Sequence, residues 1–149
     1  ETLLKDRLFF TLRKYDYSLI DCAPSLGLLT LNALTAVREI FIPIQTQFLA
    51  LQGINRLLET IEIVTRKVNP LLKVTGVIPV MYDVRTNLSQ EVLDRIRQYF
   101  RKEVFKTVIR ENVRIAESPS FGLPITLYSP DSYGAEDYMK LAKEVVSYE

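Results

Sequence analysis

The sequence predicts an α/β fold in which a mostly parallel sheet carries helices on both faces. Short apolar runs of strand type alternate along the chain with longer segments whose apolar residues recur at helical spacing. Strands that alternate with helices form parallel sheets that are covered on both sides. The 149 residues contain no internal repeat, low-complexity tract or linker, so a single domain over 1–149 is expected. Apolar residues make up 48% of the chain and charged residues 25%, which is typical of a globular protein.

The first half of the chain is expected to supply three helices and three strands. The helices are inferred from Leu, Ile and Val spaced three and four residues apart, and the third must end near Asn69 because Pro70 follows. In chain order the elements are a helix over 2–13, a strand over 17–20, a helix over 26–36, a strand over 39–44, a helix over 54–68 and a strand over 74–81.

The second half is expected to begin with a helix that Asn87 caps, because Gln90 follows three residues later. Its buried stripe is predicted to be Leu88, Val92, Leu93, Ile96, Tyr99 and Phe100. A short strand over 104–109, one or two helical turns within 112–121, an edge strand over 124–127, a turn over 129–132 and a last helix follow. The last helix is expected to turn Tyr138, Leu141, Ala142, Val145 and Val146 inward.

Composition excludes several kinds of site. Histidine is absent and Cys22 is the one cysteine, so the sequence offers neither an internal disulfide nor a histidine or all-cysteine metal site. No uncharged apolar run reaches about 18 residues, so no transmembrane helix is expected. A cytoplasmic location is the simplest interpretation. The net charge of +1 indicates little about partners.

The topology predicts where a ligand would bind. In open α/β sheets ligands lie beyond the carboxyl ends of the strands, which here means residues 21–25, 43–47, 81–86 and 109–114. Asp21 ends a predicted strand and is followed by Pro24 and a small residue, an arrangement that can hold Mg²⁺, directly or through water, beside a triphosphate. The same carboxylate could instead cap the following turn.

Residues 84–114 carry a local excess of positive charge. Eight basic residues stand against four acidic ones, so the segment is +4 by subtraction while the whole chain is +1. Lys and Arg side chains that neutralise phosphates supply the sequence-independent part of DNA binding. Arg95, Arg97 and Arg101 are expected to be a solvated helix face instead. The basic residues are Arg85, Arg95, Arg97, Arg101, Lys102, Lys106, Arg110 and Arg114.

Several strings of residues then occur in a fixed order along nearly the whole chain. They are YDYSLIDCAPSLG (15–27), LNAL (31–34), PIQ (43–45), ALQG (50–53), MYDVRTN (81–87), NVRIAESPSFG (112–122) and GAEDY (134–138). This set resembles the C-terminal portion of ParA/Soj-type chromosome or plasmid partition ATPases, which belong to the MinD/ParA superfamily of deviant Walker P-loop NTPases.

The resemblance implies an intact protein that binds ATP and Mg²⁺, dimerises around two ATP molecules and binds DNA without sequence preference. It also implies a ParB-type centromere-binding partner, no membrane, and a cytoplasmic, nucleoid-associated location. Nucleotide contacts are implied at Asp21, Pro24, Met81, Arg110 and Asn112, with Mg²⁺ at Asp21. The family more often has Pro then Arg where Arg110 and Glu111 stand.

DNA contacts are implied at Arg85 and Arg114, with Arg110 or Lys106 assisting. The phosphate loop of that fold is expected to be missing, because none of the five glycines is followed by lysine. The resemblance implies that the first strand of the fold also precedes this chain. The chain by itself, with no catalytic residue, is therefore expected neither to bind ATP tightly nor to hydrolyse it, and to be prone to aggregation.

Three alternatives to a partition ATPase can be weighed on the sequence. A MinD-like ATPase would need a basic amphipathic helix at its end, and a nitrogenase iron-protein relative would need cluster cysteines, and the sequence supports neither. A non-catalytic DNA-binding or dimer-interface fragment without ATPase activity remains possible beside the partition ATPase.

Overall fold

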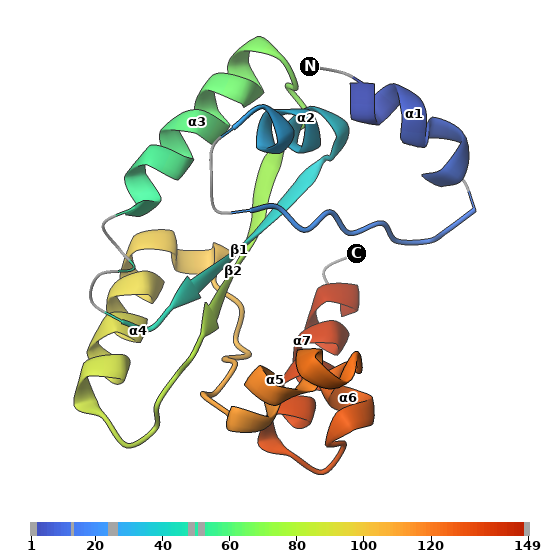
Figure 1. Ribbon diagram of the computed structural model, residues 1–149. Coiled ribbons are helices and arrows are strands. Elements are labelled where there is room, and N and C mark those ends of the chain that lie inside the picture. The colour runs from blue at the N-terminus through green and yellow to red at the C-terminus, as the bar shows by residue number, and fades with distance from the viewer. Residues whose placement is uncertain (1–2, 13, 24–26, 48–49, 51–52, 148–149) are drawn as a thin grey trace. The chain divides into compact units, whose positions relative to one another are not determined.

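The computed structural model describes residues 3–12, 14–23, 27–47, 50 and 53–147, with the elements labelled in Figure 1. The chain divides into two compact units, Glu1–Ile40 with Gln52–Thr75 and Phe41–Leu51 with Gly76–Glu149. Strands β1 (Glu39–Gln45) and β2 (Lys73–Val80) are paired. They run in the same direction, since the Lys73 amide donates to the Arg38 carbonyl near their starts and the Thr46 amide donates to the Val80 carbonyl near their ends. The predicted parallel pairing is confirmed.

The first unit holds three helices at the positions that the sequence predicts. They are α1 (Leu3–Leu12), α2 (Leu28–Ala36) and α3 (Ile54–Lys67). Helix α2 contacts both others, and α3 buries Ile54, Ile61 and Val64 on one face. As predicted, α3 ends just before Asn69, whose side-chain amide donates to two carbonyls at the end of α2, at 2.9 and 2.7 Å. That amide joins the ends of two helices.

The predicted strand over 17–20 is wrong. Residues 17–23 have no regular secondary structure, and the Leu19 side chain is 88% exposed. A strand exists only where a neighbouring backbone completes its ladder. Within the described residues the pairing of β1 and β2 does not extend to this segment. The run of Tyr, Leu and Ile has the composition of a strand, but composition alone provides no partner.

In the second unit, α4 (Asn87–Phe100) buries one face against the core. The buried residues include Val92, Leu93, Ile96 and Phe100, as predicted, whereas Leu88 and Tyr99, also predicted to be buried, are exposed. Both lie at the margins of the stripe, one in the first turn and one in the last, where the helix leaves the core.

The cap of α4 also differs from the prediction. Thr86, not Asn87, is the N-cap: its backbone is extended and its hydroxyl accepts a hydrogen bond from the Ser89 amide at 3.3 Å. Asn87 already has a position within the helix. Two adjacent residues of capping type stood at this boundary, and the backbone conformation of the preceding loop decided between them.

Residues 104–110 follow a short 3₁₀ turn (η2, Arg101–Glu103) and run beside β2, but they do not form the continuous strand that was predicted. The Phe105 amide donates to the Val77 carbonyl and the Ile109 amide donates to the Pro79 carbonyl. Four residues of this segment therefore lie opposite two residues of β2, which a regular ladder does not allow. Between them, the amides of Lys106 and Thr107 donate to the Glu144 carboxylate at 2.7 and 2.9 Å. In the middle of this segment, hydrogen bonds to a side chain of the last helix therefore take the place of hydrogen bonds to β2.

The carboxyl-terminal part consists of α5 (Val113–Glu117), the 3₁₀ turn η3 (Ser118–Phe121), α6 (Ile125–Tyr128) and α7 (Tyr133–Ser147). The helical turns expected within 112–121 are confirmed. The edge strand expected over 124–127 is wrong, because the amides of Leu127 and Tyr128 both turn back to the Pro124 carbonyl and close a helical turn.

Helix α7 packs by its first turn and not by the stripe that was predicted. Its buried residues are Gly134, Ala135 and Asp137. Of the predicted inward residues, Leu141 and Val145 are half-buried, and Tyr138, Ala142 and Val146 are exposed. Small residues near the start of the helix allow a close approach that the larger side chains farther along would prevent. Among the described helices, none combines the length and the apolar character that crossing a bilayer requires.

Candidate functional site

The loops that follow β1 and β2 meet the loop before α5 at one pocket of about 420 Å³ in the second unit. Three of the four segments in which the topology predicted a ligand are thereby brought together: 43–47, 81–86 and 109–114. The pocket is lined by Thr46, Gln47, Met81, Asp83, Thr86, Leu88, Ser89 and Glu111.

Two buried hydroxyls hold this pocket in place, and sequence reasoning missed both. Thr46 is 1% exposed, and its hydroxyl donates to the Met81 carbonyl at 3.0 Å. The Ser89 hydroxyl donates in turn to the Thr46 carbonyl at 3.4 Å. Met81 has a left-handed φ of 54°, which is uncommon for a residue other than glycine. A threonine directly after an apolar strand is the one sequence signal that could have pointed to this anchor.

Arg85 lies on the loop after β2 with a carboxylate held against it. Its Nε and Nη2 donate to the two oxygens of Asp83, each at 2.9 Å, and its backbone amide donates to the same carboxylate at 3.0 Å. These hydrogen bonds lower the pKa of Asp83 to about 2. The Arg85 side chain is nonetheless 81% exposed. The guanidinium is thus oriented by its neighbour and still open to a solvent anion.

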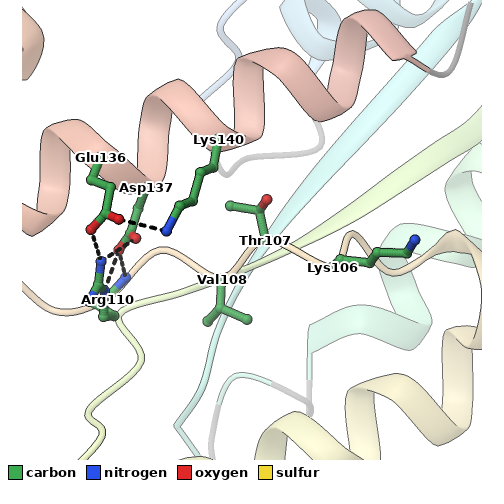
Figure 2. A pocket seen from close by; sticks show the side chains of 7 residues that line it. All are labelled: Lys106, Thr107, Val108, Arg110, Glu136, Asp137 and Lys140. Atoms are coloured by element: carbon green, nitrogen blue, oxygen red, sulfur yellow. Dashed lines mark hydrogen bonds and ion pairs between the residues drawn. The ribbon is translucent and has the colours of Figure 1, made fainter.

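Arg110 is held far more completely. Its backbone amide and Nε donate to Asp137 Oδ2 at 3.0 and 2.8 Å, and its Nη2 donates to Asp137 Oδ1 at 2.6 Å (Figure 2). The Glu136 carboxylate accepts a further hydrogen bond from Nη2, and the Tyr133 ring lies 4.4 Å from the guanidinium carbon. The hydrogen bond to Asp137 is the main cause that raises the pKa of Arg110.

Asn112 and Arg114 form the entry to α5. The Asn112 side chain caps the helix by accepting the Arg114 amide at 2.8 Å. Arg114 donates from Nη1 to Glu117 at 2.9 Å, a contact that raises the pKa of Arg114, and the Tyr128 hydroxyl donates to the same carboxylate. The Arg114 side chain remains largely exposed.

Lys106 lines a second, open pocket of about 370 Å³ together with Arg110 and residues of α7. Figure 2 shows its ammonium directed away from the Arg110 ion pairs, and the side chain is exposed. Lys106 is therefore anchored through its backbone, by Glu144, while its charge faces solvent.

Asp21 lies in the first unit, on the segment without regular structure, and its side chain is exposed. Pro24, the other predicted nucleotide contact there, lies outside the described residues. No group of three or more Cys, Asp or Glu that could hold a metal ion occurs within the described part of the chain. A lone carboxylate still suits Mg²⁺ in a nucleotide complex, because this ion keeps several waters and takes its other ligands from phosphates.

The second unit thus contains the predicted residues Met81, Arg85, Arg110 and Asn112 on loops at the end of the strands, with Arg114 in the first turn of α5 and Lys106 on the segment beside β2. It also adds Asp137, which the resemblance included in the string GAEDY (134–138) without giving it a role. Asp21 belongs to the first unit.

Comparison with known proteins gives consistent relatives. A family model described as an AAA domain matches residues 1–74. The sporulation initiation inhibitor protein Soj of Bacillus subtilis (strain 168) is 50% identical over 147 residues, which are 99% of this chain and 58% of that protein. The chromosome partitioning protein ParA of Myxococcus xanthus (strain DK1622) is 45% identical over 98% of this chain and 52% of its own length.

Among solved structures, cobyrinic acid a,c-diamide synthase from Mycobacterium smegmatis with a bound ATP analog and magnesium matches with a TM-score of 0.82 and 32% identity. The match covers 97% of this chain and 53% of that one, so the chain spans little more than half the length of the proteins it matches. The fold class predicted from the sequence, including its P-loop NTPase character, is confirmed. Given identities of 45–50% over nearly all of its residues, the chain belongs to the ParA/Soj family of chromosome-partitioning proteins.

Proposed function

We propose that the intact protein is a partition ATPase that, when loaded with ATP and dimeric, binds DNA without sequence preference and segregates a chromosome or plasmid. The observation that carries the proposal is the pair of exposed guanidiniums: Arg85 on the loop after β2, and Arg114 in the first turn of α5, three residues after Glu111 of the pocket lining. Relatives named as chromosome-partitioning proteins and ATPases support the biological role.

The chemistry of these arginines suits phosphate binding. The Arg85 and Arg114 side chains are 81% and 58% exposed, and ion pairs made by exposed side chains contribute little to stability because water and salt screen them. A DNA phosphate can therefore compete for either guanidinium at small cost. Lys106 offers a further exposed charge. Arg110 is committed to a buried carboxylate, so we propose that it assists by holding its loop.

For the nucleotide, we propose that Asp21 holds Mg²⁺, directly or through water, and that Pro24, Met81, Arg110 and Asn112 lie near the base or phosphates. When bound, the ion neutralises charge on the phosphates. The carboxylate of Asp21 is exposed and can accept a water or an ion, and the Met81 carbonyl is held by Thr46, which keeps this strand end rigid. The diamide synthase that carries an ATP analog and magnesium supports this assignment.

The central test is DNA retention by the intact protein with ATP. The double variant Arg85→Glu/Arg114→Glu should lose retention of duplex DNA while ATP affinity is unchanged. The matched control is Arg95→Glu/Arg97→Glu, which makes the same charge change on the exposed face of α4 and should retain DNA. Milder Gln variants at the two sites should lower the salt slope of binding by about 2, one for each lost phosphate contact. Equal losses in the two Glu variants would show that only bulk charge matters.

A second function is favoured by one feature of the sequence: no glycine is followed by lysine, so residues 1–149 contain no phosphate loop. A non-catalytic module that binds DNA or a second subunit would fit the same loops. Calorimetric titration of the intact protein with ATP separates the two possibilities, because only the ATPase predicts tight binding there. Neither possibility predicts tight binding by residues 1–149 alone, which are titrated as the comparison. Micromolar affinity in the isolated segment would contradict both.

Three further parts of the proposal concern assembly and place in the cell. A homodimer should appear in sedimentation only with ATP, and a ParB-type centromere-binding protein should stimulate hydrolysis. A fluorescent fusion should follow the nucleoid and should become diffuse in the Arg85→Glu/Arg114→Glu variant. A fusion that stays on the nucleoid in that variant would contradict the DNA contacts.

A further inference from the structure

We infer that the first turn of α7 positions the start of α5 and the loop before it, with Asp137 as the positioning residue for Arg114. The inference rests on the proposed DNA function and gives a role to Asp137, which the string GAEDY (134–138) contains without a stated role. Asp137 itself is 3% exposed and cannot contact DNA. It acts through Arg110, four residues before Arg114.

The first link is the carboxylate of Asp137. It accepts three hydrogen bonds from one residue, Arg110: one from the backbone and two from the guanidinium. A buried carboxylate that lost this partner would be strongly destabilised, so the pair persists. Because a backbone amide is among the donors, the contact fixes the main chain as well as the side chain. The Arg110 main chain is also bridged to Tyr82, so its path is set from two sides.

The second link is the close approach of Gly134. A Cβ added at this glycine would lie 2.6 Å from Ile115 Cγ1 and 3.5 Å from the side-chain nitrogen of Asn112. The helix backbone therefore rests directly against the start of α5. Asn112 also caps α5 by accepting a hydrogen bond from the Arg114 amide. Helix α7 therefore contacts the chain on both sides of this cap, at Arg110 before it and at Ile115 after it.

Together these contacts clamp residues 110–115, and Arg114 lies inside the clamp. The Arg114 side chain is 58% exposed and pairs with Glu117 of the same helix, and α7 contacts the chain on both sides of it, at Arg110 and Ile115. A preorganised guanidinium loses less conformational entropy when it binds a phosphate. Release of the clamp should therefore weaken DNA binding through Arg114 and through no other basic residue.

The test is a double-mutant cycle in the intact protein, read as the dissociation constant for random-sequence duplex DNA with saturating ATP. Asp137→Asn keeps the shape of the side chain and removes its charge, and should raise the constant about tenfold, within the range for residues of one network. In the Arg114→Gln background the same change should have an effect of less than about twofold. Glu91→Gln, on the exposed face of α4, is the control for loss of one negative charge.

Gly134→Ala provides an independent route to the same loop, without a change of charge, if Asp137→Asn proves poorly folded. It should show the same dependence on Arg114. Equal losses in both backgrounds would mean that Asp137 only stabilises the unit, and the inference would be wrong; no loss in either background has the same consequence. If instead Arg114→Gln binds DNA as well as the unchanged protein, the proposed DNA function itself fails, which is a separate result.

Discussion

Gly76 and Phe105 offer the sharpest test of the packing. An added Cβ at Gly76 would lie 2.0 Å from Phe105 Cε2 and 2.8 Å from Cδ2 and Cζ. Carbon atoms in contact are normally separated by about 3.5 Å, so the ring would have to move by about 1.5 Å. Phe105 is 1% exposed, its amide is bound to Val77, and its ring contacts Phe41 at a centroid distance of 5.8 Å. The ring has no free space into which it can move.

We therefore expect Gly76→Ala to destabilise the intact protein by about 3 kcal/mol, at the upper end of the range for overpacked cores. Phe105→Ala should cost a similar amount, about 3–5 kcal/mol, because it leaves a cavity. In the Phe105→Ala background, however, Gly76→Ala should be neutral or stabilising by about 0.5 kcal/mol, since alanine is preferred to glycine within a strand.

Urea unfolding of the four proteins, followed by circular dichroism, measures these differences as shifts of the midpoint at constant slope. The coupling free energy should be about 3 kcal/mol and of opposite sign to the sum of the single effects. Two results would refute the reasoning: an unchanged midpoint in Gly76→Ala, or effects that simply add in the double variant. Either would mean that the ring does not occupy the space beside the glycine.

The remaining predictions concern local contacts. Thr86→Ala should destabilise the protein by about 1 kcal/mol because α4 loses its N-cap, whereas Asn87→Ala should be nearly neutral in the same melts; the reverse order would contradict the assigned cap. Asp83 should titrate near pH 2 by NMR, and Arg85→Ala should return its pKa toward 3.8. Because the folded-state value is the lower one, the stabilisation by this carboxylate is complete above pH 3.8 and is lost as the pH falls toward 2; a value near 3.8 with arginine present would contradict the ion pair. Burial alone would raise the pKa of Glu144, but the hydrogen bonds that its carboxylate accepts lower it. Glu144→Gln should therefore speed hydrogen exchange at the amides of Lys106 and Thr107, which donate to this carboxylate. Exchange at the Phe105 amide, which donates to the Val77 carbonyl, should be unchanged and is the control.

Much of the helical structure could be predicted because its signals are local. The boundaries of α2, α3 and α4 follow from apolar spacing and from the residues that end each helix, and a helix satisfies its own backbone hydrogen bonds. The strands β1 and β2 were also predictable, as apolar runs between helices. Their carboxyl ends then located three of the loops that meet at the pocket, because parallel strands end at the same edge.

Strands at the margins could not be predicted in the same way, because a strand depends on a distant neighbour. Residues 17–20 have strand composition and no ladder, and residues 104–110 exchange part of their ladder for the Glu144 carboxylate, 37 and 38 residues away. The segment 124–127 is helical because the Pro124 carbonyl accepts hydrogen bonds from the amides of Leu127 and Tyr128. In each case the outcome depends on which hydrogen-bond partner the tertiary structure places next to the backbone.

The sequence by itself determined the class of fold, the family and the arginines that face solvent, because strings of residues, apolar periodicity and charge are properties of the chain. Only the tertiary structure showed that Thr46 anchors Met81 and that Asp137 holds Arg110. Their partners are 35 and 27 residues away, and a polar residue that is buried and fully hydrogen-bonded looks, in the sequence, like one that is exposed. Packing brings donor and acceptor together, and that encounter gives these side chains their role.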